Sequence, residues 1–169
     1  MRVFSEYPSP LGTLLLEADG EALRSVQIRP PVSAISTKEN DVLRRTAAWL
    51  DRYFAGEPVS PSALPLRPVG TPFRLLVWRL LADIPYGKSV SYGELAAECA
   101  TAMGVPRMSA QAVGGAVGHN PVSLIVPCHR VVGANGNLTG YGGGLDRKVR
   151  LLALEGADMN AFFLPAPKG

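Results

Sequence analysis

The stretch SYGELAAECATAMGVPRMSAQAVGGAVGHNP, residues 91–121, predicts two short helices separated by a turn. Ser91 is followed three residues later by Glu94, a reciprocal capping pair that satisfies free backbone N–H groups where a helix begins. The first helix is therefore expected from Tyr92 to about Ala102. Pro106 interrupts the pattern, and a second helix of small residues is expected from about Ala110 to Val117. Two helices joined in this way favour a helix-turn-helix, although plain helical hairpins share the pattern.

Helical signals also lie on both sides of this stretch. Thr71-Pro72 places a capping residue before a proline at the first helical position, and a broad apolar surface follows until Pro85. A last helix is expected from Asp146 to Glu155, ending at Gly156. Residues 70–169 thus form a mostly helical lobe.

The first part of the chain alternates like an antiparallel meander. Three short strands are expected at residues 2–7, 13–18 and 23–28, followed by a helix from about Asp41 to Ala55. The Pro-rich run at residues 58–68 fits neither period and is typical of a connector. We therefore expect an α+β fold in which an N-terminal α/β lobe and its connector, residues 1–69, precede the helical lobe, residues 70–169.

Composition places the chain among soluble globular proteins. Of 169 residues, 47% are hydrophobic and 18% charged, and there are only two cysteines. The N-terminus lacks a signal-peptide pattern and no apolar run is long enough to cross a bilayer, so a cytoplasmic rather than secreted protein is expected. Residues 1–69 hold eight basic and eight acidic side chains, whereas residues 70–156 hold eight and five. This basic bias permits a polyanionic partner without requiring one.

The segment from Val122 to Gly133, VSLIVPCHRVVG, carries the strongest chemical signal. A short apolar strand is expected to deliver Cys128 next to His129 and Arg130, and a nearby histidine, cation or helix start lowers the pKa of a thiol. A buried inert thiol is the ordinary interpretation of a lone cysteine, and Cys99 fits it, because it shares a helical face with Leu95 and Met103.

Glu155 is the expected partner of His129. It falls on the same helical face as Leu152 and Lys148, so its carboxylate is expected to point toward the interior and to need a partner. A Cys, His, Glu relay follows the general logic of nucleophile, base and orienting acid. A solvated carboxylate near a helix end is the alternative.

Several motifs in this order resemble one known family. They are the segments Ser91-Tyr92-Gly93-Glu94-Leu95, Ala112-Val113-Gly114-Gly115-Ala116, Gly118-His119-Asn120-Pro121, Ile125-Val126-Pro127-Cys128-His129-Arg130-Val131-Val132 and Gly140-Tyr141-Gly142-Gly143-Gly144-Leu145. Together they resemble the O6-alkylguanine-DNA alkyltransferases, over about Thr71 to Gly156. The resemblance implies a ribonuclease-H-like N-terminal lobe and a winged-helix-like C-terminal lobe.

The resemblance implies a role for each matching residue of the acceptor site. Cys128 would accept the alkyl group, His129 would act as the base that reaches it through a water, and Glu155 would orient the histidine. Asn120 would tie the helix-turn-helix to the active-site segment. Tyr92 would contact the phosphate of the target nucleotide, help to rotate the nucleotide out and serve as a proton donor.

The resemblance also implies contacts with DNA in the minor groove. Tyr141 and Gly142 would wall the pocket, and the carbonyl of Val126 would read the guanine amino group. Ala112 and Gly115 would allow the recognition helix to approach the DNA closely. The remaining expected DNA or substrate contacts are Gln111, Arg130, Arg107 and Lys148, with Lys88 and Arg147 as further candidate phosphate contacts.

The chain departs from the family pattern in two places. Gln111 stands where members usually carry an arginine that fills the space of the flipped base, and residues 98–108 form a longer connection than expected. No cofactor is expected. The zinc that some relatives hold in the N-terminal lobe is not expected either, since neither cysteine lies in that lobe.

These features predict direct-reversal DNA repair, in which Cys128 irreversibly takes an alkyl group from O6 of guanine in double-stranded DNA. O4-alkylthymine remains a second possible substrate. A non-enzymatic lesion sensor is the first alternative, but such proteins lack the cysteine; a DNA-binding regulator would need base-reading side chains on the recognition helix. A Cys/His hydrolase would need an oxyanion hole that the sequence does not reveal. A monomer is expected, with cooperative assembly along DNA left open.

Overall fold

The computed structural model describes residues 2–28, 40–138 and 144–163, and its internal contacts divide the chain into two compact units. The first unit is Met1–Gly70 with Pro121–Val126, and the second is Thr71–Asn120 with Pro127–Gly169. This grouping differs from the expected ranges 1–69 and 70–169 at Pro121–Val126. The reason is backbone pairing: Val26 N–H donates to Pro121 O at 3.0 Å, and Ser123 N–H donates to Val26 O at 3.0 Å.

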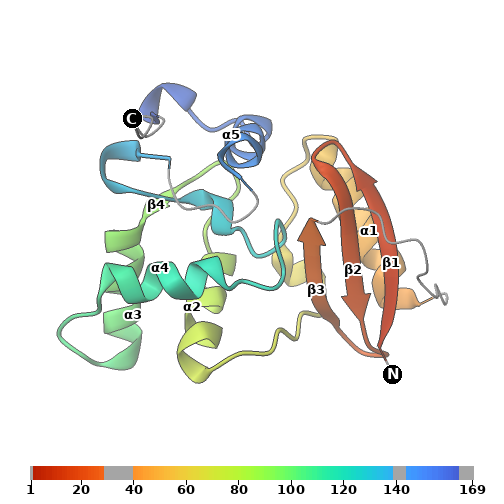
Figure 1. Cartoon of the computed structure of the whole chain (residues 1–169), viewed down its shortest axis with the longest axis horizontal. Helices are drawn as coiled ribbons and strands as arrows, with labels where there is room; N and C mark the ends of the chain where they lie inside the picture. The colour runs from red at the N-terminus through yellow and green to blue at the C-terminus, as the bar shows by residue number, and fades with distance from the viewer. Residues whose placement is uncertain (1, 29–39, 139–143, 164–169) are drawn as a thin grey trace. The chain divides into compact units, whose positions relative to one another are not determined.

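An antiparallel sheet with one helix forms most of the first unit (Figure 1). Its strands β1 (Val3–Ser9), β2 (Gly12–Ala18) and β3 (Leu23–Ile28) pair in that order, and helix α1 (Asp41–Phe54) packs against them. Asn40 caps α1 by accepting a hydrogen bond from Leu43 N–H. Side chains buried in this unit include Leu14, Leu16, Leu23, Leu50 and Tyr53. The predicted sheet and helix are confirmed.

The prediction of an apolar strand before Cys128 is wrong. Residues 122–126 instead form tight turns, with one isolated bridge from Val122 to Val26. Val126 N–H donates to Val122 O at 3.0 Å, and Leu124 has a φ of 71°, a left-handed conformation that strands do not use. An apolar run indicates a buried segment, and here the buried segment forms turns rather than an extended strand.

Three helices pack together in the second unit: α2 (Pro72–Ala82), α3 (Tyr92–Met103) and α4 (Ala110–Gly118). Thr71, Ser91 and Ser109 each cap the helix that follows, as local sequence signals predicted for the first two. Trp78 Nε1–H donates to Ala116 O at 2.8 Å and joins α2 to α4. Cys99 is buried as expected, but Met103 is 44% exposed, because α3 ends there at the left-handed Gly104.

The remaining elements connect the acceptor segment to α3. The two-residue strands β4 (Val90–Ser91) and β5 (Val131–Val132) pair in parallel, so the residues after Cys128 lie beside the start of α3. Helix α5 (Leu145–Leu154) follows, one residue earlier at each end than predicted. Short 3₁₀ turns form η1 (Pro61–Ala63), η2 (Cys128–Arg130), η3 (Ala134–Gly136) and η4 (Met159–Ala161). Among the described helices, none has the length and apolar character that crossing a membrane requires.

Candidate active site

Cys128 begins the 3₁₀ turn η2 and is partly buried. Burial raises the pKa of its thiol above the usual value of 9.0. A hydrogen bond from the Asn120 side chain, the charge of Lys148 and the backbone N–H groups of the turn act in the opposite direction. The expected net lowering of the thiol pKa is therefore wrong, because desolvation outweighs these groups. The thiol needs a base to lose its proton.

His129 and Glu155 form a buried pair. His129 Nε2 lies 2.5 Å from Glu155 Oε2, and neither side chain is exposed. Burial lowers the pKa of His129, which keeps the imidazole neutral at neutral pH. Because the ionised carboxylate can only accept, Nε2 carries the proton and Nδ1 is left unprotonated. Nδ1 is buried and has no hydrogen-bond partner in the described part of the chain, so it is the atom free to act as a base.

Arg130 holds the other oxygen of the same carboxylate. Its Nε–H donates to Glu155 Oε1 at 2.7 Å and an Nη1–H donates to Ile84 O at 2.7 Å. Burial opposes the ionisation of Glu155, but the hydrogen bonds from His129 and Arg130 and the charge of Arg130 outweigh it and lower the pKa of Glu155 to about 2. The expected contact of Arg130 with DNA or substrate needs correction, since its side chain is 4% exposed and its guanidinium is occupied within the protein.

The turn at Tyr86-Gly87 completes the cage around Glu155. Gly87 N–H donates to Glu155 Oε1 at 3.3 Å, and the Arg130 guanidinium lies 5.7 Å from the centre of the Tyr86 ring. Gly87 has a φ of 77°, and a Cβ there would lie 3.1 Å from Glu155 O. The sequence predicted only that a helix stops at Pro85 and assigned no role to Tyr86 or Gly87, although the Pro-Tyr-Gly turn was a signal for a tight backbone approach.

Lys148 lies inside the second unit rather than on its surface. The residue is fully buried, and its Nζ donates to Val131 O at 2.6 Å. Burial lowers the pKa of Lys148 to about 8, while the charge of Cys128 raises it. The predicted phosphate contact is therefore wrong, because an enclosed ammonium cannot reach DNA. Its charge acts on the Cys128 thiol instead.

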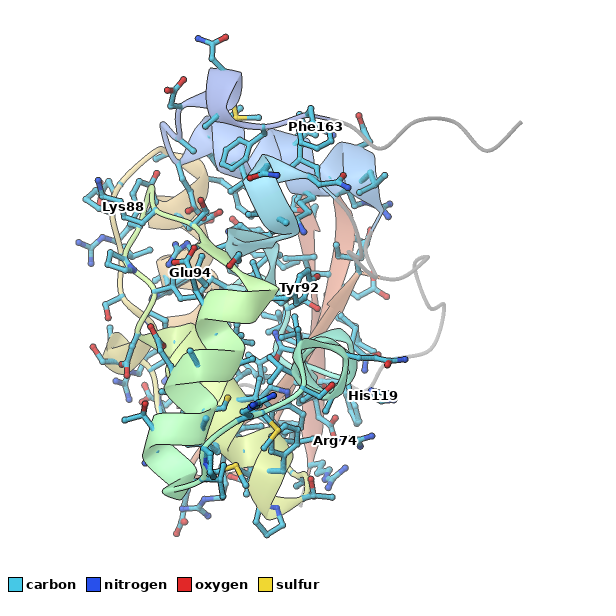
Figure 2. The ribbon with its side chains drawn as sticks, turned by 90° about the vertical axis from the view of Figure 1, so that its left-hand side faces the viewer. Arg74, Lys88, Tyr92, Glu94, His119 and Phe163 are labelled. Carbon is cyan, nitrogen blue, oxygen red and sulfur yellow. The ribbon has the colours of Figure 1, made fainter. Side chains whose placement is uncertain are left out.

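Tyr92 lies half-buried at the start of α3 (Figure 2). Burial raises the pKa of Tyr92, and the charge of Cys128 raises it further. The Tyr92 hydroxyl and the Cys128 thiol therefore interact electrostatically. Its ring also packs on α4, because a Cβ at Gly114 would lie 3.7 Å from two atoms of the ring. The structure thus brings Cys128, His129, Glu155, Asn120 and Tyr92 together within the second unit.

The surface of α4 carries the expected small residues. Gln111, Ala112 and Gly115 are exposed along this helix, and Arg107 is exposed in the turn before it. Lys88 is exposed in another turn, and His119 lies beside α4 with its Nδ1 2.7 Å from Gly115 O (Figure 2). Side chains that read bases are sparse on this face.

Three further residues were expected to contact the DNA or the substrate. Tyr141 and Gly142 lie outside the described residues. Val126 is buried and groups with the first unit.

Two family models match most of the chain. The model of the 6-O-methylguanine DNA methyltransferase DNA-binding domain matches residues 72–157, and the model of the ribonuclease-like domain of the same proteins matches residues 3–68. The chain belongs to this family. The α+β fold inferred for these methyltransferases is confirmed by the three-stranded sheet and the helical second unit.

Individual methyltransferases match over most of their length. A methylated-DNA–protein-cysteine methyltransferase of Haemophilus influenzae is 41% identical over 157 residues, 90% of this chain and 85% of the relative. That of Mycobacterium tuberculosis is 45% identical over 152 residues, 87% and 88%. A solved structure of Mycobacterium tuberculosis OGT in complex with DNA has a TM-score of 0.77 and 41% identity, covering 90% of this chain and 91% of its own.

Proposed function

We propose that this protein repairs O6-alkylguanine in double-stranded DNA by moving the alkyl group onto Cys128. The observation that carries the proposal is a partly buried Cys128 next to the buried pair of His129 and Glu155, in a chain whose relatives are methylated-DNA–protein-cysteine methyltransferases. Residues 70–169 are the DNA-binding and alkyl-acceptor lobe in this proposal. The protein works as a cytoplasmic monomer.

The chemistry follows from the protonation states of the site. His129 Nδ1 takes the thiol proton through a water, and Glu155 holds the imidazole in the orientation and tautomer that this requires. The Cys128 sulfur then attacks the alkyl carbon as the bond from that carbon to guanine O6 breaks. Tyr92 donates a proton to the departing guanine and regains one, through solvent, as the protonated imidazole of His129 gives up the proton it took. The net reaction therefore moves one proton from the thiol to guanine.

The protein is consumed by this reaction. A thioether has no good leaving group, and the site contains no second nucleophile that would release the alkyl group among the residues described. Each molecule therefore repairs one lesion.

DNA binding in this proposal uses shape and charge rather than base reading. The target atom lies inside the duplex, so the nucleotide must be rotated out before it can react. The small exposed residues of α4 permit close approach in the minor groove, and Lys88 and Arg107 are exposed cations for phosphate contacts. Affinity should accordingly fall as salt rises and depend weakly on sequence.

Intact mass spectrometry after incubation with duplex DNA containing O6-methylguanine tests the proposal. We expect a gain of one methyl group per protein molecule, and peptide mapping should place it on Cys128. Cys128→Ser should bind the same duplex without accepting a methyl group, and Cys99→Ser is the matched control that should react normally. A methyl group on Cys99, or many turnovers per molecule, would contradict the proposal.

A further inference from the structure

The segment Asp158–Phe163, here called the C-terminal strap, lies beyond residue 157, where the match to the DNA-binding domain ends. It contains the 3₁₀ turn η4, which Asp158 caps by accepting a hydrogen bond from Asn160 N–H. In Figure 1 this blue segment lies next to the cyan turn formed by residues 133–138. The two segments are in direct contact.

Backbone hydrogen bonds attach the strap to this turn. Phe163 N–H donates to Gly136 O at 3.0 Å, and Leu138 N–H donates to Phe163 O at 2.8 Å. Asn137 and Phe163 thereby form an isolated parallel bridge. The Phe163 ring is 49% exposed and is labelled near α5 in Figure 2, so the backbone of this residue rather than its ring makes the attachment.

Gly136 permits the two segments to approach this closely. Its φ is 86°, and a Cβ at this position would lie 2.0 Å from Ala161 O. A larger residue would therefore displace the strap in addition to straining the turn. Gly136 N–H also donates to Gly133 O, which closes the turn from its other side.

Apolar packing adds to the attachment. Val132, Leu138 and Leu152 form a buried cluster, and Met159 and Phe162 of the strap pack against it. The strap thus covers one side of the core that supports both β5 and α5.

The turn is continuous with the acceptor segment. Cys128–Arg130 leads directly into β5 and then into residues 133–138, and β5 pairs with β4 immediately before Tyr92. Any displacement of the turn therefore acts on the acceptor segment and, through the pairing of β5 with β4, on the start of α3 where Tyr92 lies.

We propose that the C-terminal strap is a positioning element for substrate binding, acting through its backbone attachment to Gly136 and Leu138. This proposal rests on the proposed function, the transfer of an alkyl group to Cys128. The thiol itself is held by other contacts, namely Asn120, Lys148 and the turn η2. Loosening the strap consequently weakens the productive binding of the lesion without changing the intrinsic reactivity of the thiol.

Phe163→Pro tests this, because it removes the N–H that bonds Gly136, and the extended Phe162 (φ −117°, ψ 155°) already suits a residue before proline. Phe163→Ala keeps the N–H and is the matched control. Single-turnover methyl transfer is measured against duplex concentration, together with the rate of Cys128 alkylation by iodoacetamide. We expect the half-saturating duplex concentration to rise roughly three- to tenfold, the factor that one lost backbone hydrogen bond represents. The maximal rate and the iodoacetamide rate should stay unchanged, and Phe163→Ala should behave as wild type.

Other results would overturn the proposal. These are an unchanged half-saturating concentration in Phe163→Pro, an equal effect of Phe163→Ala, or a loss confined to the maximal rate and the iodoacetamide rate. If Phe163→Pro fails to fold, Gly136→Ala displaces the strap at Ala161 and should raise the half-saturating concentration in the same way. A wild-type protein that transfers no methyl group would instead refute the proposed function.

Discussion

His129 and Glu155 are expected to act as one unit. Their buried contact orients the imidazole, so replacing either side chain with glutamine removes the same contribution to catalysis. His129→Gln and Glu155→Gln should each slow methyl transfer roughly 100-fold, the usual scale of general base catalysis, with little change in duplex affinity. The double variant should be about as slow as the slower single one, measured by single-turnover kinetics. Fully additive losses would assign Glu155 a structural role only, and Asp146→Asn, an exposed carboxylate on the same helix, is the control.

Lys148 is expected to lower the pKa of the Cys128 thiol. Its charge lowers the pKa of Cys128 against the effect of burial, so Lys148→Met should raise that pKa. Transfer at neutral pH should slow about tenfold for each pH unit of that rise, and the rate should recover as the pH increases. The measurement is the pH profile of Cys128 alkylation by iodoacetamide and by methylated duplex. Arg150→Met removes an exposed charge from the same helix and should leave the profile in place. An unshifted profile in Lys148→Met would show that the ammonium serves packing alone.

At the scale of elements, α4 carries the substitution that distinguishes this chain from the family pattern. Gln111 is exposed on α4 and offers hydrogen bonds but no charge, whereas an arginine would stack on neighbouring bases as a planar cation. Gln111→Arg should therefore speed repair of duplex DNA roughly threefold to tenfold, the scale of one cation–π contact. Reaction with free O6-benzylguanine, which needs no nucleotide flipping, should barely change.

The turn before α4 provides the control for this prediction. If exposed Arg107 compensates for the missing arginine, Arg107→Ala should strongly slow the duplex reaction and leave the free base reaction intact. Equal changes with both substrates in Gln111→Arg would instead place the effect in the pocket or the fold.

For the whole molecule, Glu155 links stability to pH. Its pKa falls from 4.5 to about 2 on folding, so its ionisation stabilises the fold above pH 4.5, and this contribution disappears as the pH falls from 4.5 toward 2. The contribution is about 3 kcal/mol for this buried group. Glu155→Gln should lower the thermal midpoint at neutral pH and flatten its dependence on pH between 5 and 3. The control is Asp19→Asn, which removes a partly buried carboxyl of lowered pKa from the first unit and should leave the contribution of Glu155 to the pH dependence in place. The same slope in wild type and Glu155→Gln would contradict the assignment.

Local signals in the sequence were sufficient for most elements and for the centre of the site. Ser91 with Glu94 and Thr71 with Pro72 marked helix starts that the structure retains, because a cap is formed by residues within one turn of each other. The pairing of Cys128 with His129 could be predicted because the two residues are adjacent in the chain. The inward orientation of Glu155 could be predicted from its helical spacing to Leu152.

Contacts between distant segments required the tertiary structure. Lys148 and Arg130 were predicted to contact DNA or substrate, yet they bond Val131, Ile84 and Glu155 inside the second unit. The left-handed Leu124 breaks an apolar run that favours a strand, and Gly136 meets Ala161 through the fold. Residues close together in the chain were therefore enough to predict the family, the helices with their own caps and the acceptor pair. Which charges are buried could be seen only in the folded protein, because burial depends on the residues that pack from elsewhere in the chain.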